Sequence, residues 1–98
     1  MATLIKITGT KTTVFPKNKR KGFTLEEVYE LLECELVQQV SVNNGAEDIM
    51  LVDEEGTCKE GWTERINMEA TRIFIRTYGS GVNVIVGNVL LCNDKEWK

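Results

Sequence analysis

The sequence contains no histidine and only one proline among its 98 residues. Histidine is the commonest general base and metal ligand near neutral pH, so its absence excludes Ser-His-Asp and Cys-His catalytic arrangements. Cys34, Cys58 and Cys92 are far apart and form no C-x-x-C pair. A zinc site would need all three cysteines plus a carboxylate, and a disulfide would leave one cysteine over. We therefore expect reduced thiols, no metal and no cofactor.

Long hydrophobic runs are missing as well. No apolar stretch approaches the roughly 20 residues that span a bilayer, and the N-terminus lacks a basic segment followed by an apolar one. We therefore expect a soluble, cytoplasmic protein without a membrane partner. With 42% apolar residues, the chain can bury a modest core. We expect a single domain over residues 1–98 with a flexible C-terminal tail over about residues 93–98.

The net charge of −3 is unevenly distributed along the chain. Lys17, Lys19, Arg20 and Lys21 place four positive charges within five residues, so the other 93 residues carry a formal −7. A protein that binds duplex nucleic acid is expected to show a broad basic face. The acidic remainder therefore argues against duplex nucleic acid as a partner.

The N-terminal half predicts a β-hairpin followed by a helix. Residues 3–8 and 12–15 have extended apolar patterns, and Pro16 ends the second of them because it cannot donate a ladder hydrogen bond. Thr24 and Glu27 have the spacing of a capping box. Apolar residues then recur at helical spacing, which predicts an amphipathic helix over about residues 25–34.

The middle of the chain predicts a second hairpin. Two strands, about residues 36–42 and 48–53, flank Asn43-Asn44-Gly45, which favours a tight primed turn. Residues 57–59 are expected to add a short strand extension. The hairpin and its extension would contribute up to three strands to the sheet.

The C-terminal part predicts a helix and a buried strand. Asn67 can cap a helix over about residues 68–77, which Gly79-Ser80-Gly81 would end. Residues 82–92 are almost continuously apolar, which indicates a central strand buried on both faces, with Gly87 as a bulge or close approach. The expected fold is a small α+β domain, with a mainly antiparallel sheet of about five strands and two helices in the order β-β-α-β-β-(β)-α-β.

Four motifs resemble, in the same order, those of a family of unknown function (DUF3846-like). They are Thr24-Leu25-Glu26-Glu27, Leu51-Val52-Asp53-Glu54-Glu55-Gly56, Asn67-x-x-Ala70-Thr71 and Ile85-Val86-Gly87-Asn88-Val89-Leu90. The family comprises small proteins of bacteriophages, mobile elements and gut anaerobes, and the resemblance covers about residues 3–92. It implies a protein of phage or mobile-element type without an established activity. One departure is the loop 61–66, which lacks the Gly-Leu-Pro-type turn frequent in the family.

Catalytic groups are hard to find in this sequence. The carboxylate pairs Glu26-Glu27 and Asp53-Glu54-Glu55 lie at a predicted helix start and in a predicted turn, where solvated carboxylates are ordinary. No cysteine has a recognisable base. Residues 79–81 are not followed by the lysine motif of a phosphate-binding loop. We therefore expect a protein that is not an enzyme, with an enzyme acting on a nucleotide or small acid as the weakest alternative.

Two groups of residues are candidate ligand-binding sites. The first combines an aromatic ring that could stack on a base with guanidinium groups that recognise phosphate. Its members are Trp62, Arg65, Asn67, Arg72 and Arg76. The alternative is that the two helical arginines pair with Glu69 or Asp residues while the tryptophan covers the edge of the core.

The second candidate is the basic loop, defined as Lys17, Lys19, Arg20 and Lys21. It precedes a helix N-terminus, whose free amides and dipole favour phosphate. The alternative is a solvated loop that balances an acidic surface. Neither pattern identifies a particular anion.

Three functions remain open at this point. The first is a small-ligand-binding protein that sequesters a nucleotide-derived immune signalling molecule and so inhibits host anti-phage defence, as a homo-oligomer. The second is a protein-binding inhibitor or adaptor of a host factor, which would use an acidic surface or an exposed strand edge. The third is the enzyme described above.

Overall fold

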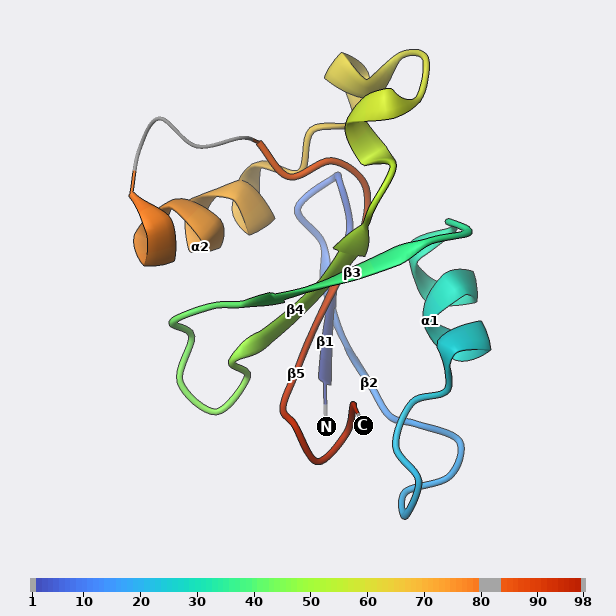
Figure 1. The fold of residues 1–98 in the computed structure, drawn as a ribbon. Helices are drawn as coiled ribbons and strands as arrows, with labels where there is room; N and C mark the ends of the chain where they lie inside the picture. The colour runs from blue at the N-terminus through green and yellow to red at the C-terminus, as the bar shows by residue number, and fades with distance from the viewer. Residues whose placement is uncertain (1, 80–83, 98) are drawn as a thin grey trace.

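Five β-strands form an antiparallel sheet in the computed structural model, which describes residues 2–79 and 84–97. The strands are β1 (Ala2–Ile5), β2 (Lys11–Val14), β3 (Val37–Ser41), β4 (Ile49–Asp53) and β5 (Val89–Cys92). Their order across the sheet is β2-β1-β5-β4-β3, so β5 lies at the centre and β2 and β3 are the two edges (Figure 1). The predicted α+β class and antiparallel sheet are confirmed.

Two α-helices lie on opposite sides of the sheet (Figure 1). Helix α1 (Leu25–Leu32) begins at the predicted capping box, and helix α2 (Met68–Tyr78) begins at Asn67 as predicted. Helix α1 ends earlier than predicted because Glu33 adopts a left-handed conformation with φ of 55°. Two short 3-10 helices, η1 (Gly56–Cys58) and η2 (Trp62–Arg65), connect β4 to α2.

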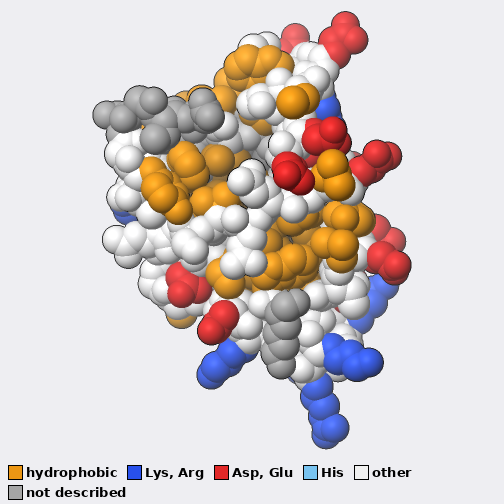
Figure 2. Space-filling model, in the orientation of Figure 1, with side chains coloured by type: hydrophobic (Ala, Val, Ile, Leu, Met, Phe, Trp, Pro, Cys, Tyr) orange, Lys and Arg blue, Asp and Glu red, His pale blue; other side chains and the backbone are white. Residues whose placement is uncertain are grey.

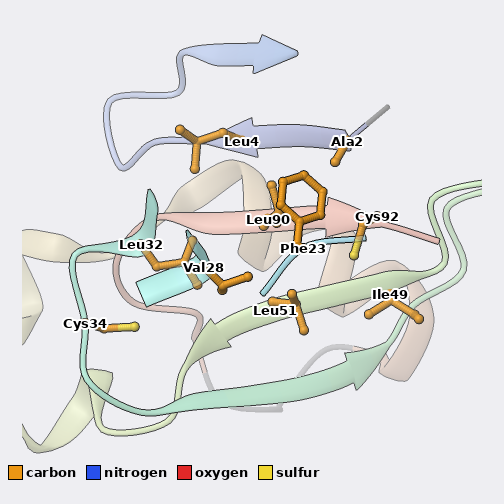
Figure 3. Packing of buried hydrophobic residues seen from close by; sticks show 10 residues of the cluster. All are labelled: Ala2, Leu4, Phe23, Val28, Leu32, Cys34, Ile49, Leu51, Leu90 and Cys92. Carbon is orange, nitrogen blue, oxygen red and sulfur yellow. The ribbon is translucent and has the colours of Figure 1, made fainter. Parts of the chain in front are cut away.

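Each face of the sheet has its own hydrophobic cluster. The cluster under α1 contains Ala2, Leu4, Phe23, Val28, Leu32, Cys34, Ile49, Leu51, Leu90 and Cys92, which point toward one another in Figure 3. The cluster under α2 contains Ile5, Val42, Met50, Val52, Ala70, Ile73, Ile85, Val89 and Leu91. Alternation along β4 sends Leu51 to the first cluster and Met50 and Val52 to the second, as side-chain periodicity in a strand requires.

The central strand is shorter than the sequence predicts. All four residues of β5 are buried, which fits burial on both faces, but the strand begins only at Val89. Gly87 interrupts the extended run with φ of 87°, and its N–H donates to the carbonyl of Arg65 at 2.8 Å. Over the described residues just upstream of Gly87, 84–86, an isolated bridge pairs Val86 with Ile66. Residues 82 and 83 of the predicted strand lie outside the described residues, as do Ser80 and Gly81.

The predicted tight turn at Asn43-Asn44-Gly45 is wrong, although the hairpin itself forms. Ser41 pairs with Ile49, and the N–H of Val42 donates to the Asp48 carbonyl at 2.9 Å, so residues 43–47 make the connection, as the predicted strand bounds of 36–42 and 48–53 imply. Val42 is buried under α2, and the N–H of Asn43 donates to Thr77 Oγ1 at 2.7 Å. The connection is thus longer than a two-residue turn, and its first residue is bonded to α2.

One further prediction is corrected between β4 and α2. The expected strand extension at residues 57–59 is replaced over residues 56–58 by the helix η1, in which the N–H of Cys58 donates to the Glu55 carbonyl at 3.0 Å. The flexible tail over residues 93–98 stays a prediction, and two of its residues bond to the rest of the domain. The N–H of Phe23 donates to the Glu96 carbonyl at 2.7 Å, and Trp97 Nε1 donates to Gln39 Oε1 at 3.0 Å.

Candidate functional site

A groove of about 560 Å³ lies between α2 and the β3 edge of the sheet. Val40 and Val52 form its apolar floor, and Phe74 and Tyr78 line it from α2. Ligand sites are typically clefts of this size with an apolar lining and a few polar groups. In Figure 2, hydrophobic side chains gather over α2, between β3 and α1, and at the top of the view over the segment that connects β4 to α2.

The wall opposite the sheet is fixed by buried hydrogen bonds. The N–H of Ile85 donates to Thr71 Oγ1 at 2.9 Å, and the N–H of Asn67 donates to the Ile85 carbonyl at 2.8 Å. Ile85 and Val86 both line the groove. The start of α2 thus fixes the position of Ile85 and Val86, which follow α2 in the sequence.

The other end of α2 is tied to the end of β3. The Tyr78 hydroxyl donates to the Ser41 carbonyl at 2.6 Å. The rings of Phe74 and Tyr78 are in contact, with centroids 4.7 Å apart. Together with the Asn43–Thr77 hydrogen bond, these contacts hold the aromatic wall at a fixed place beside the strand.

Hydrogen-bond alternation shows which backbone groups of β3 face outward. The N–H of Glu54 donates to the Leu36 carbonyl, and the N–H of Val42 donates to the Asp48 carbonyl. In an antiparallel ladder every second residue bonds to the same neighbour. The even-numbered residues of β3 therefore bond to β4, whereas Val37, Gln39 and Ser41 direct their N–H and C=O groups away from it.

The side chains of β3 alternate in the same way. Gln38 and Val40 pair across the ladder with Val52 and Met50, which face α2, while Gln39 pairs with Leu51, which faces α1. Gln39 nevertheless lines the groove. Because its side chain bonds to Trp97 on the α1 side, its contribution to the groove is its backbone. The groove thus extends to the outer edge of the strand.

The electrostatic character of the groove is acidic. Among the described residues that line it, none is basic, and Glu54 stands at one end with its side chain in no ion pair found within the described part of the chain. The nearby Asp53 is already neutralised, because Lys59 Nζ lies 2.6 Å from its Oδ2 and the N–H of Glu55 donates to its Oδ1. A phosphate would find no counter-charge in this groove.

The predicted aromatic and arginine group is not gathered into one cavity. Trp62 and Arg65 belong to η2, whereas Arg72 and Arg76 are exposed on α2. Arg72 Nη1 lies 3.6 Å from Glu69 Oε2, as the alternative interpretation expected. Arg76 lines a separate hollow that it shares with Glu69 and other polar residues. None of these residues lines the groove beside β3.

Asn67 is removed from the ligand-binding group. Its side chain is fully buried, and the N–H of Ala70 donates to its Oδ1 at 3.0 Å. Its Nδ2 donates to the carbonyls of Ile5 at 3.0 Å and Gly87 at 2.9 Å. With every polar atom used internally, Asn67 caps α2 and ties it to the central strands rather than meeting a ligand.

The basic loop also differs from the predicted anion site. Asn18 Oδ1 accepts hydrogen bonds from the N–H groups of Arg20 and Lys21, which fold the loop. The Glu27 carboxylate accepts from the N–H of Lys17 at 3.0 Å and from the N–H of Thr24 at 3.1 Å. These two amides, one from the basic loop and one from the cap of α1, are thus taken by a carboxylate of the chain itself. Lys17 and Lys19 remain exposed.

These two amides lower the pKa of Glu27 from its ordinary value of 4.5, first through Lys17 and then through Thr24. A lowered pKa in the folded state means that the stabilisation is complete above 4.5 and is lost as the pH falls below 4.5 toward the folded-state pKa. We expect Glu27→Gln to have a lower melting temperature than the wild type at neutral pH, with the difference shrinking in acid.

Thermal melts followed by circular dichroism across this pH range check that prediction. Glu26→Gln is the matched control, because it removes a charge from the same helical turn but not a cap. A deficit in Glu27→Gln that stays constant down to strongly acidic pH would contradict the assigned cap.

The cysteines do not form a reactive site. All three thiols are free; Cys34 and Cys92 are buried and Cys58 is exposed. Burial, followed by the carboxylates of Glu96 and Glu47, raises the pKa of Cys92 to about 12. Burial and then Asp53 raise the pKa of Cys34 as well. Over residues 2–79 and 84–97, no group of three or more metal-ligating side chains could hold an ion.

No family model, curated protein or solved structure matches the chain. The resemblance to the phage and mobile-element family therefore stays a prediction. Within the part of the chain that the structure describes, no helix has the length and apolar character needed to cross a membrane.

The sequence reasoning missed the groove at β3. Its strand was predicted, but local sequence does not reveal that β3 ends up at an edge, because strand order is set by long-range pairing. One signal was present. Gln38 and Gln39 are polar and adjacent in a strand, which indicates that both faces of this strand are partly exposed.

Proposed function

We propose that the protein is a non-enzymatic binding protein that takes up an extended segment of a partner protein along the edge of β3. The observation that carries this proposal is the groove of about 560 Å³ beside β3, whose outward backbone groups face no other strand of the part of the chain that the structure describes. It corresponds to the second function that the sequence left open, an inhibitor or adaptor that works through an exposed strand edge.

Strand addition suits this edge for a physical reason. An unpaired edge presents a row of N–H and C=O groups that an extended peptide can satisfy, while pockets for alternate side chains supply specificity. Val37 and Gln39 each offer one N–H and one C=O, and Ser41 offers its N–H, since its carbonyl already accepts from Tyr78. A partner strand would send every second side chain into the groove between β3 and α2.

We propose a peptide rather than a nucleotide as the ligand, because the basic side chains that would bind a phosphate do not line the groove. Trp62, Arg65, Arg72 and Arg76 do not line the groove. Glu27 occupies the amides of Lys17 and of the cap residue Thr24. For a protein of phage or mobile-element type, the partner would be a host protein.

We also propose a cytoplasmic location. Its support is the set of three free thiols, because a reducing compartment keeps cysteines in this form. Homo-oligomerisation stays a prediction.

Proline scanning of the strand tests the proposed function. At Gln39 the N–H points outward, so Gln39→Pro removes an edge donor but leaves the ladder with β4, and proline is tolerated at such edge positions. We expect the variant to fold and to bind peptides from a displayed random library about ten-fold more weakly or worse than the wild type, the effect of one lost hydrogen bond and a blocked approach.

Gln39→Ala is the matched control, since it also loses the hydrogen bond to Trp97 but keeps the backbone N–H. It should bind selected peptides like the wild type. Equal binding by Gln39→Pro would contradict the proposal. Light scattering gives a further test. If the wild type has the mass of two chains and Gln39→Pro the mass of one, the edge of β3 binds a second copy of the protein, and the proposal is overturned.

A further inference from the structure

One end of the groove is aromatic and the other is acidic. Two residues of β3, Val40 and Gln38, lie near these two ends. Phe74 and Tyr78 line the end near Val40. Glu54 lies at the other end, near Gln38, because its N–H bonds to Leu36 at the start of the strand. Gln38 and Val40 are two residues apart and face the same side of the sheet.

A strand added to β3 would present its own side chains with the same period. The residues opposite Gln38 and Val40 would both project into the groove, while the residue between them would face the α1 side. The residue opposite Val40 meets two aromatic rings and aliphatic carbon. The residue opposite Gln38 meets an amide oxygen and lies toward the end of the groove that Glu54 lines.

We infer that the groove selects a segment in which an apolar residue precedes a lysine or arginine by two positions, an inference that rests on the proposed function. The order follows from the direction of the strand. Every pairing in this sheet is antiparallel, and antiparallel pairing is slightly the more stable. A segment antiparallel to β3 reaches Val40 first and Gln38 second, so its apolar residue comes before its basic one.

The surroundings of the groove support a cationic partner. Beyond Glu54, the end of the molecule where β3 begins also carries Glu30, Glu33, Glu35 and Glu55, which line an adjacent hollow with Lys59 as the basic residue among them. These exposed carboxylates do not form a site of their own. They raise the rate at which a cationic segment approaches this edge and repel an acidic one.

Three synthetic peptides and a charge reversal test the inference on the full chain. The first peptide is Thr-Val-Phe-Thr-Lys-Val-Thr, the second has Glu in place of Lys, and the third has Phe and Lys exchanged. In isothermal titration calorimetry, the wild type should bind the first peptide roughly two- to five-fold more tightly than the second, the range for an exposed ion pair. It should also bind the first peptide more tightly than the third.

Glu54→Lys should reverse the preference between the first two peptides. Glu60→Lys, which makes the same charge change at an exposed residue outside the groove, should leave it unchanged. Equal binding of the Lys and Glu peptides by wild type and Glu54→Lys would overturn the inferred selectivity, as would no binding of any of the three. The proposed function is judged separately, by whether Gln39→Pro binds library-selected peptides as well as Gln39→Ala does and by the light-scattering mass of the two variants.

Discussion

Replacing Asn67 with alanine should reduce the free energy of unfolding by about 3–7 kcal/mol. The loss combines about 1 kcal/mol for the missing helix cap with about 1–3 kcal/mol for each buried carbonyl left without its donor. The two carbonyls are those of Ile5 and Gly87. Small domains have about 5–15 kcal/mol in total, so urea denaturation followed by circular dichroism should show a much lower midpoint.

Two controls separate the contributions of Asn67. Asn67→Ser keeps an acceptor for the N–H of Ala70 but cannot donate to the two carbonyls, so it should recover only the cap contribution. Asn43→Ala, at an exposed residue, should change the free energy of unfolding by less than about 0.5 kcal/mol. A loss below about 1 kcal/mol in Asn67→Ala would show that its side chain is not the buried tie described above.

Gly22→Ala should destabilise the domain by about 2–4 kcal/mol, the sum of left-handed strain and overpacking. Gly22 has φ of 77°, and a Cβ there would overlap the Glu96 carbonyl, with the carbonyl carbon only 2.8 Å away. That carbonyl accepts the hydrogen bond from Phe23. The substitution should therefore push the C-terminal segment off the α1 face of the sheet.

The matched control is Gly9→Ala. Gly9 also has a positive φ, of 90°, but nothing lies within 4 Å of its Cβ position. It should therefore show the strain alone, about 1 kcal/mol. Urea denaturation compares the two variants, and equal losses would mean that residues 93–97 are not held where the structure places them.

Local signals in the sequence predicted the helices well. The capping box at Thr24 and Glu27 and the cap at Asn67 depend on hydrogen bonds that close within three residues. Both helices therefore begin where the sequence places them. The buried central strand was predicted for a similar reason, because an apolar run requires burial on both faces wherever the strand lies.

Contacts between segments far apart in the chain explain the features that the sequence did not predict. Gly87 shortens β5 because its backbone turns to meet Arg65, a contact between segments far apart in the chain. Residues 43–47 connect β3 to β4 through more than a two-residue turn, and Asn43 at their start bonds to Thr77 of α2. The Glu96 carbonyl near the C-terminus accepts from the N–H of Phe23. None of these partners lies near in sequence.

The candidate site could be predicted only in part for the same reason. Helical spacing correctly placed Arg72 and Arg76 on α2, but it could not reveal that Glu69 pairs with Arg72 or that η2 carries Trp62 and Arg65 separately. Likewise, the alternation of Gln38 and Val40 identified a strand. Its edge position, and hence its outward amides, emerges only from the order of five strands.

Amide hydrogen exchange measured by NMR tests the central claim, that a partner segment adds to the edge of β3. On addition of the Thr-Val-Phe-Thr-Lys-Val-Thr peptide, the outward amides of Val37, Gln39 and Ser41 should exchange markedly more slowly. The amides of Gln38 and Val40, already bonded to β4, should change little. Unchanged exchange at the three outward amides, with peptide-induced shifts at the basic loop or at Arg72 and Arg76 instead, would contradict the account.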